Sequence, residues 1–150
     1  GIQLIWQTGK NFAPQASKAL APYEGKGFIT MPFIKEMDKA YAAADIVVSR
    51  AGAIAISELC ITGKPSILVP SPNVAEDHQT KNAMALSTRN AAILVKDSEA
   101  AESLVSKITE LAADPAEQLR LSTNISAMAI RNSAQQIAEY AFMLAGKSKK

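Results

Sequence analysis

Short apolar runs alternate with longer stretches of helical periodicity along the chain, which is typical of alternating strands and helices. The apolar runs predict strands at residues 4–6, 25–29, 46–48, 66–69 and 92–95. Apolar positions that recur every three or four residues predict helices at 14–20, 35–44, 53–62, 76–89, 98–112, 115–128 and 134–145. Gly63 is expected to end the helix 53–62 as its C-cap, and Ser98 to begin the helix 98–112 as its N-cap.

This order predicts an α/β fold with a parallel sheet covered by helices on both faces, that is, a doubly wound, Rossmann-like layer. No repeat, low-complexity tract or linker divides the sequence, so one domain over residues 1–150 is expected. The first predicted strand lies almost at Gly1, and no Gly-rich loop precedes it. A doubly wound domain normally begins with a strand and a phosphate-facing turn, and other residues precede that strand. We therefore expect the chain to be a piece of a longer protein.

The net charge of +2 comes from the C-terminal tail, where three of the last four residues are lysines. The rest of the chain is close to neutral, and aromatic residues make up only 5%. Proteins that bind nucleic acid usually have a basic stripe with aromatic platforms, so no nucleic acid is expected as a partner. No apolar stretch reaches the ~18 residues of a membrane span. The single cysteine, Cys60, fits a reducing cytoplasm.

Several kinds of site are excluded by the residues present. One His and one Cys cannot form a zinc site, and we expect no metal and no cofactor. The motifs G-x-G-x-x-G and G-x-x-x-x-G-K-[ST] do not occur, which argues against a dinucleotide-dependent enzyme and a P-loop NTPase. Cys60 lies on an apolar helix face with no His near it in sequence, so it is expected in the core.

The densest candidate cluster follows the strand 46–48, which is expected to be buried and to end at Ser49 and Arg50. Ala51, Gly52 and the helix start at Ala53 are small enough for a ligand to approach the backbone. The N–H groups and positive dipole end of such a helix suit a phosphate at the carboxyl edge of the sheet. Glu58 in the same helix can accept hydrogen bonds from paired hydroxyls, as in a ribose. The alternative is that the small residues only allow packing and that Glu58 is solvated.

A second cluster follows the next strand, 66–69. A loop with prolines leads into the polar run Glu76-Asp77-His78-Gln79, with Asn82 one turn later. These donors and acceptors suit a polyhydroxylated ligand such as a sugar. Ordinary helix capping with a surface histidine is the alternative, but the two polar sets follow adjacent strands and are expected at one edge of the sheet.

The third candidate is the loop Met31-Pro32-Phe33-Ile34. Backbone groups beside an apolar ring can hold a flat heterocycle. The alternative, that Phe33 and Met37 are core residues, is favoured by the sequence alone.

Taken together, the order F-I…A-D-I-V-V-S-R-A-G-A…S-E…G-K-P-S-I-L-V-P…H-Q…N resembles the donor-binding C-terminal domain of the MurG family of bacterial N-acetylglucosamine (GlcNAc) transferases. The resemblance implies one half of a GT-B fold, which has two Rossmann-like domains. It implies an inverting, metal-independent transfer of GlcNAc from UDP-GlcNAc to lipid I, which gives lipid II. It also implies that the N-terminal acceptor domain lies outside this chain. The donor domain's first strand, with its Gly-Gly-Ser loop, is likewise implied to lie outside it.

Residue by residue, the resemblance implies a place for each part of the nucleotide. The backbone of Ile34 would contact the uracil, and Glu58 would hold the ribose hydroxyls. The helix start at Ala53, Ile54 and Ala55 would face the diphosphate.

His78 and Gln79 would face the GlcNAc hydroxyls, with Asn82 close by. Some members of the family have Gln in place of His78, which makes Gln79 the stronger sugar contact. No residue is assigned as a catalytic base.

The resemblance also implies a role in peptidoglycan and cell wall biogenesis, and with it in cell division and cell shape. The partners implied are UDP-GlcNAc, lipid I through the N-terminal domain, and the cytoplasmic face of the bacterial inner membrane through a peripheral parent protein. The isolated chain is expected to be inactive. Two alternatives stay open: a piece of a UDP-GlcNAc 2-epimerase or of another GT-B transferase, and a non-catalytic domain that binds nucleotide-sugars.

Overall fold

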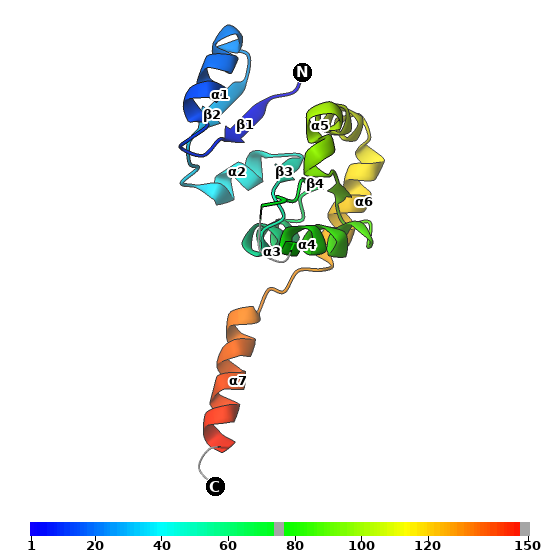
Figure 1. The fold of residues 1–150 in the computed structure, drawn as a ribbon. Coiled ribbons are helices and arrows are strands. Elements are labelled where there is room, and N and C mark those ends of the chain that lie inside the picture. Colours follow the sequence, from blue (N-terminus) through cyan, green and yellow to red (C-terminus); the bar gives the residue numbers. More distant parts are fainter. Residues whose placement is uncertain (74–76, 148–150) are drawn as a thin grey trace. The chain divides into compact units, whose positions relative to one another are not determined.

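The computed structural model describes residues 1–73 and 77–147, and Figure 1 shows its elements in chain order. The chain divides into two compact units, Gly1–Ala44 and Asp45–Lys150. They are called the N-terminal unit and the C-terminal unit below. Within the described ranges, no helix is long and apolar enough to cross a bilayer.

The N-terminal unit holds two parallel strands joined through helix α1. Its elements are β1 (Leu4–Gln7), α1 (Ala13–Leu20), the short 3-10 helix η1 (Ala21–Tyr23), β2 (Phe28–Met31) and α2 (Met37–Ala43). Leu4 pairs with Phe28, and the register continues to the end of both strands. Ala16 of α1 and Tyr41 of α2 are the buried apolar residues of this unit. A strand–helix–parallel strand connection is the repeating piece of a doubly wound fold, as predicted.

The C-terminal unit holds a parallel sheet in the order β3–β4–β5. Its elements are β3 (Val47–Ser49), α3 (Ala53–Thr62), β4 (Ser66–Leu68), α4 (His78–Ser87), β5 (Ile93–Leu94), α5 (Asp97–Ala112), α6 (Pro115–Ser126) and α7 (Ser133–Lys147). Val48 pairs with Ile67, and Leu68 pairs with Leu94. The central strand β4 is buried along its whole length, because it has a neighbour on each side and helices over it.

The core of the C-terminal unit forms where α5 and α6 cover this sheet. It joins side chains in or directly after β4 and β5 to the inner faces of the two helices: Ile67, Val69, Val95, Leu111 and Leu121. Cys60 of α3 is 5% exposed, as predicted for a core residue, and burial raises the pKa of its thiol. The thiol therefore stays protonated at neutral pH and packs as a small apolar side chain.

Gly63 ends α3 as predicted. It adopts the left-handed conformation (φ 65°), and its N–H donates to the carbonyl of Leu59 at 2.9 Å. The hydroxyl of Ser122 in α6 donates to the carbonyl of Gly63 at 2.7 Å. The loop between α3 and β4 is therefore held from α6.

The strands are parallel as predicted, and they are divided between a two-stranded sheet in the N-terminal unit and a three-stranded sheet in the C-terminal unit. Two predicted positions are wrong for local reasons. Helix α5 begins at Asp97 after Lys96 as the N-cap residue, so Ser98 is not the cap. The strand predicted at 25–29 lies at Phe28–Met31, because Gly25 and Gly27 have φ of 74° and 84° and break the extended backbone.

Helix α4 begins later than predicted, at His78. Asp77 has φ of 55°, and a helix cannot continue through a residue with that backbone angle. Glu76, where the helix was predicted to begin, lies outside the described residues. Strand β3 is less buried than predicted, since Val48 is 41% exposed. Phe33 is exposed as well and is not the core residue that the sequence favoured. Met37, the other residue favoured for the core, is half-buried on α2.

Candidate functional site

The predicted phosphate-binding backbone lies at the start of α3. This helix follows β3 directly and begins at Ala53, so its N-terminus is at the carboxyl edge of the β3–β4–β5 sheet. Gly52 occupies the N-cap position and has no side chain that could accept from the first N–H groups. Its φ is −68°, and a Cβ built on it would meet nothing within 4 Å. The helix end is therefore open to an anion, and its dipole favours negative charge there.

The four residues predicted to contact the nucleotide from α3 lie within the first six positions of that helix. Ala53 and Ile54 are exposed, and Ala55 and Glu58 are half-buried. Glu58 lies five residues after the helix start, which is about 7.5 Å along the axis. A ligand with phosphates at the helix end and hydroxyls about that far away would fit this spacing.

The polar residues of α4 lie at the same edge, and two of them bond to the loops after the strands. The Gln79 Oε1 accepts from the backbone N–H of Ala51 at 3.2 Å and from that of Ser71 at 2.9 Å. The Asn82 Nδ2 donates to the carbonyl of Ala51 at 3.1 Å. His78 is exposed at the start of α4. The structure therefore brings both predicted clusters together, as expected for adjacent parallel strands.

Arg50 also connects elements at this edge, although no specific role for it was predicted from the sequence. Its Nη1 donates to the carbonyl of Val69 at 3.2 Å and lies 3.4 Å from that of Pro70. It also forms an ion pair with Asp97 in the first turn of α5. Arg50 thus connects the loop after β3 to the loop after β4 and to the start of α5. The only signal for this in the sequence is its position directly after the strand.

The N-terminal unit contains the loop predicted to hold a heterocycle. A hollow of about 470 Å³ is lined there by Ile5, Met31, Phe33 and Ile34, with charged side chains of α2 and the preceding loop at its rim. Phe33 is 66% exposed. The N–H of Ile34 donates to Oε1 of Gln7 at 2.8 Å. A flat apolar ligand has a surface to lie on in this hollow, and a ligand acceptor would compete with Gln7 for the N–H of Ile34.

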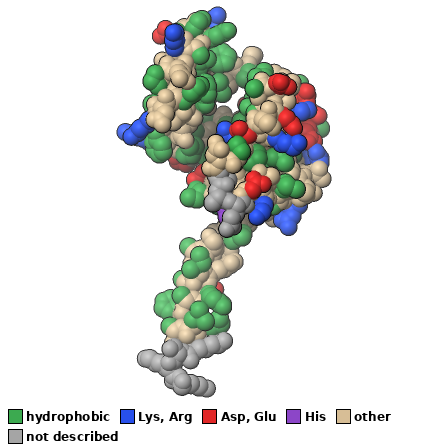
Figure 2. All heavy atoms as spheres, in the orientation of Figure 1, with side chains coloured by type: hydrophobic (Ala, Val, Ile, Leu, Met, Phe, Trp, Pro, Cys, Tyr) green, Lys and Arg blue, Asp and Glu red, His purple; other side chains and the backbone are tan. Residues whose placement is uncertain are grey.

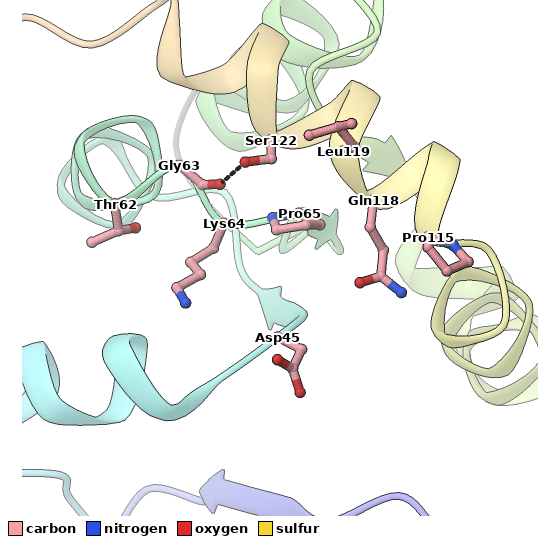
Figure 3. Close-up of a pocket in the computed structure, with 9 residues that line it drawn as sticks. All are labelled: Asp45, Thr62, Gly63, Lys64, Pro65, Pro115, Gln118, Leu119 and Ser122. Carbon is pink, nitrogen blue, oxygen red and sulfur yellow. Dashed lines mark hydrogen bonds between the residues drawn. The ribbon is translucent and has the colours of Figure 1, made fainter.

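A second hollow lies at the other end of the β3–β4–β5 strands (Figure 3). It measures about 400 Å³ and contains none of the predicted site residues. Asp45 before β3 and Pro65 before β4 line one side, and Gln118 and Leu119 of α6 line the other. Ligands of open α/β sheets bind at the carboxyl ends of the strands, so this hollow is at the wrong edge for a donor site. Within the ranges 1–73 and 77–147, no group of acidic, His or Cys side chains is placed to hold a metal ion.

Comparison with known proteins identifies the family. Residues 1–139 match the sequence profile of the glycosyltransferase family 28 C-terminal domain. The chain belongs to this family. Its parallel sheets and helices match one half of a GT-B glycosyltransferase, in agreement with the fold class predicted from the sequence.

Relatives with assigned names point the same way. A protein of Porphyromonas gingivalis is 56% identical over 139 residues, which cover 93% of this chain and 37% of that protein. A protein of Bacteroides thetaiotaomicron is 52% identical over 145 residues, covering 96% of this chain and 39% of the relative. Both are named UDP-N-acetylglucosamine–N-acetylmuramyl-(pentapeptide) pyrophosphoryl-undecaprenol N-acetylglucosamine transferase. The chain spans about two fifths of the length of the relatives it matches.

Solved structures support the fold. The crystal structure of MurG from Acinetobacter baumannii superposes with a TM-score of 0.79 at 26% identity, covering 93% of this chain and 40% of that one. The glycotransferase of kitacinnamycin superposes with a TM-score of 0.64 at 22% identity over 92% of this chain and 34% of that one, which shows the fold alone.

Proposed function

We propose that the chain is the donor-binding C-terminal domain of a two-domain GlcNAc transferase, called the parent protein below. The parent protein would transfer GlcNAc from UDP-GlcNAc to lipid I and so form lipid II for peptidoglycan synthesis. The observation that carries this proposal is the open N-terminus of α3 with Glu58 on the same helix, in a chain 56% identical to a relative named as such a transferase.

In this proposal the C-terminal unit binds the diphosphate and the two sugars of the donor. The backbone at Ala53, Ile54 and Ala55 donates to the diphosphate, and the dipole of α3 stabilises its charge. Glu58 accepts from the ribose hydroxyls. Because the UDP leaving group gains negative charge as its bond to GlcNAc breaks, a fixed positive helix end favours the transition state over the ground state.

The GlcNAc would lie against the start of α4, where His78, Gln79 and Asn82 offer polar groups. The uracil would lie in the hollow of the N-terminal unit, beside the backbone of Ile34. These ligand contacts are inferred from the family resemblance and from the position of each residue at its strand end or hollow.

An inverting displacement also needs a base that takes the proton of the acceptor hydroxyl. We assign this base, the lipid I site and the attachment to the cytoplasmic face of the inner membrane to the N-terminal part of the parent protein. The expected links to cell division and cell shape follow from peptidoglycan synthesis. No residue of this chain is proposed as the base.

Product analysis of the parent protein tests the proposal. Purified protein is incubated with UDP-GlcNAc, with and without lipid I, and both the lipid and the nucleotide-sugar products are identified. Lipid II together with UDP, formed only when lipid I is present, is the expected result. A change of the UDP-sugar without lipid I would identify an epimerase instead, and tight donor binding without any product would identify a non-catalytic domain.

A further inference from the structure

Two side chains of α4 hold both backbone polar groups of a single residue in the loop after β3. The N–H of Ala51 donates to Oε1 of Gln79, and its carbonyl accepts from Nδ2 of Asn82. Gln79 and Asn82 are three residues apart on the helix and therefore lie on the same face. Ala51 is fully buried, so the bonds from α4 replace those that water would otherwise make.

The oxygen of Gln79 also bonds to a second loop. It accepts from the N–H of Ser71, which follows β4, at 2.9 Å. Both donors are backbone N–H groups, and this assigns the oxygen of the Gln79 amide to the loops. One side-chain atom thus bridges the loops after two neighbouring strands, and the Nε2 group of the same amide takes no part in this bridge.

These bonds act immediately before the start of α3. Ala51 precedes the N-cap residue Gly52, and the backbone predicted to donate to the diphosphate begins at Ala53. Fixing both polar groups of Ala51 fixes the direction in which the first N–H groups of α3 point. A donor that is already oriented costs no reorganisation when its anion binds.

We propose that Gln79 and Asn82 are positioning residues that orient the N-terminus of α3 toward the diphosphate of a nucleoside diphosphate sugar. This inference rests on the proposed function and deepens it, because it makes α4 responsible for diphosphate recognition as well as for contacts with the sugar. It also makes a prediction that a direct sugar contact does not make. Loss of either amide weakens binding of UDP, which carries no GlcNAc.

The test compares three ligands in the parent protein and in two shape-conserving variants, Gln79→Met and Asn82→Leu. Each variant removes one hydrogen bond to Ala51, so we expect UDP and UDP-GlcNAc to bind about tenfold more weakly, which is the usual effect of one such bond. Uridine, which lacks the phosphates, should bind as it does to the wild type. The double variant should lose little more than either single one, because both act on the same residue. Ser87→Ala, at the other end of α4, is the matched control.

A second readout needs no ligand. Amide hydrogen exchange should become faster for residues 51–55 in both variants and stay unchanged in Ser87→Ala. Weaker binding of UDP-GlcNAc with unchanged binding of UDP would overturn the inference and leave Gln79 as a sugar contact only. An equal loss of affinity for uridine would overturn the inference as well, since such a loss indicates general unfolding. Unchanged exchange at residues 51–55 in both variants would overturn the inference, whether or not the parent protein binds a nucleotide. If exchange is faster in the variants but the wild-type parent protein binds no UDP, the proposed function is contradicted instead.

Discussion

At the carboxyl edge of the β3–β4–β5 sheet, the sequence indicated which polar residues lie near a ligand, but it did not predict their hydrogen-bond partners. The sequence indicated Gln79 and Asn82 as polar groups near a ligand, because they follow a strand in a polar run. Their bonds to Ala51 join residues 28 and 31 positions apart, and no local pattern predicts such a pairing. Arg50 was missed for the same reason, since the carbonyls it contacts belong to the next strand's loop.

Glu58 is the residue whose proposed role is easiest to separate from folding. It is half-buried on α3 and takes no part in the apolar core, so its removal should cost little stability. For Glu58→Ala in the parent protein we expect kcat/KM for UDP-GlcNAc to fall roughly 30- to 1,000-fold, because a carboxylate bonded to two hydroxyls contributes ~2–4 kcal/mol. Steady-state kinetics and a thermal unfolding curve measure the two effects.

Glu102→Ala is the matched control for that experiment. Glu102 is an exposed carboxylate on α5, and its loss should change neither activity nor stability. If Glu58→Ala keeps its kcat/KM while remaining folded, the assignment of Glu58 to the ribose is wrong.

At the scale of elements, the order of strands and helices could be read from periodicity, and errors occurred where single residues change the backbone. The bounds of α3 agree with the prediction, because a continuous helical pattern ends at a glycine. Strand β2 starts later than predicted after two glycines with positive φ, and α4 starts later after Asp77, which also has positive φ. A positive φ at an aspartate depends on the surrounding structure and has no reliable sequence signal.

Gly63 shows how one position sets the end of an element. For Gly63→Ala we expect the free energy of unfolding to fall by roughly 1–3 kcal/mol, since Ala at positive φ is strained and its Cβ would meet a neighbour. That neighbour is Oγ of Ser126, which lies far inside contact distance of the added atom. Urea denaturation of the 150-residue chain measures the change.

Two variants make that result specific. Gly52→Ala has negative φ and open space, so it should change stability by less than about 0.5 kcal/mol. Ser126→Ala should recover part of the loss when combined with Gly63→Ala, because it removes the atom nearest the new Cβ. Equal stability of Gly63→Ala and the wild type would mean that α3 can end without a left-handed residue.

On the scale of the whole molecule, each of the two sheets ends in a strand with an open edge. Within the described residues, β1 pairs only with β2, and β3 pairs only with β4. Apolar side chains on β1 and β3 are exposed, among them Ile5 and Val48. The family resemblance implies a further donor-domain strand outside this chain, and we expect such a strand to cover an open edge of this kind.

The open strand edges lead to a prediction about self-association. Open strand edges and apolar surface favour pairing between molecules. We expect the 150-residue chain to form concentration-dependent oligomers in light scattering, and a chain extended at its N-terminus by an apolar strand to stay monomeric. Hydrogen exchange should slow in the extended chain at the strand with which the added segment pairs, β1 or β3. Unchanged exchange at both strands would show that the added segment does not pair with them.

Apolar side chains are also exposed along α7, where green atoms gather over the helix in Figure 2. The largest are Ile137, Tyr140, Phe142, Met143 and Leu144. The sequence pattern could not predict this exposure. The periodicity of 134–145 is that of an ordinary amphipathic helix, and such a helix usually packs on its own domain. What such a helix packs against is decided by partners outside its own sequence.

Catalysis is the property for which the parent protein and this chain should differ most. The chain holds the proposed donor site, whereas we assign the base and the acceptor site to the rest of the parent protein. A positioned base contributes about 10²- to 10⁴-fold, and holding two reactants together contributes more still. We therefore expect the purified 150-residue chain to form no measurable lipid II from UDP-GlcNAc and lipid I, under conditions in which the parent protein converts both. Chromatography of the lipid products measures this, with the Glu58→Ala parent protein as a reference for residual activity. Lipid II formed by the 150-residue chain alone would show that the base and the acceptor site lie within these residues, and the division of roles proposed above would then be wrong.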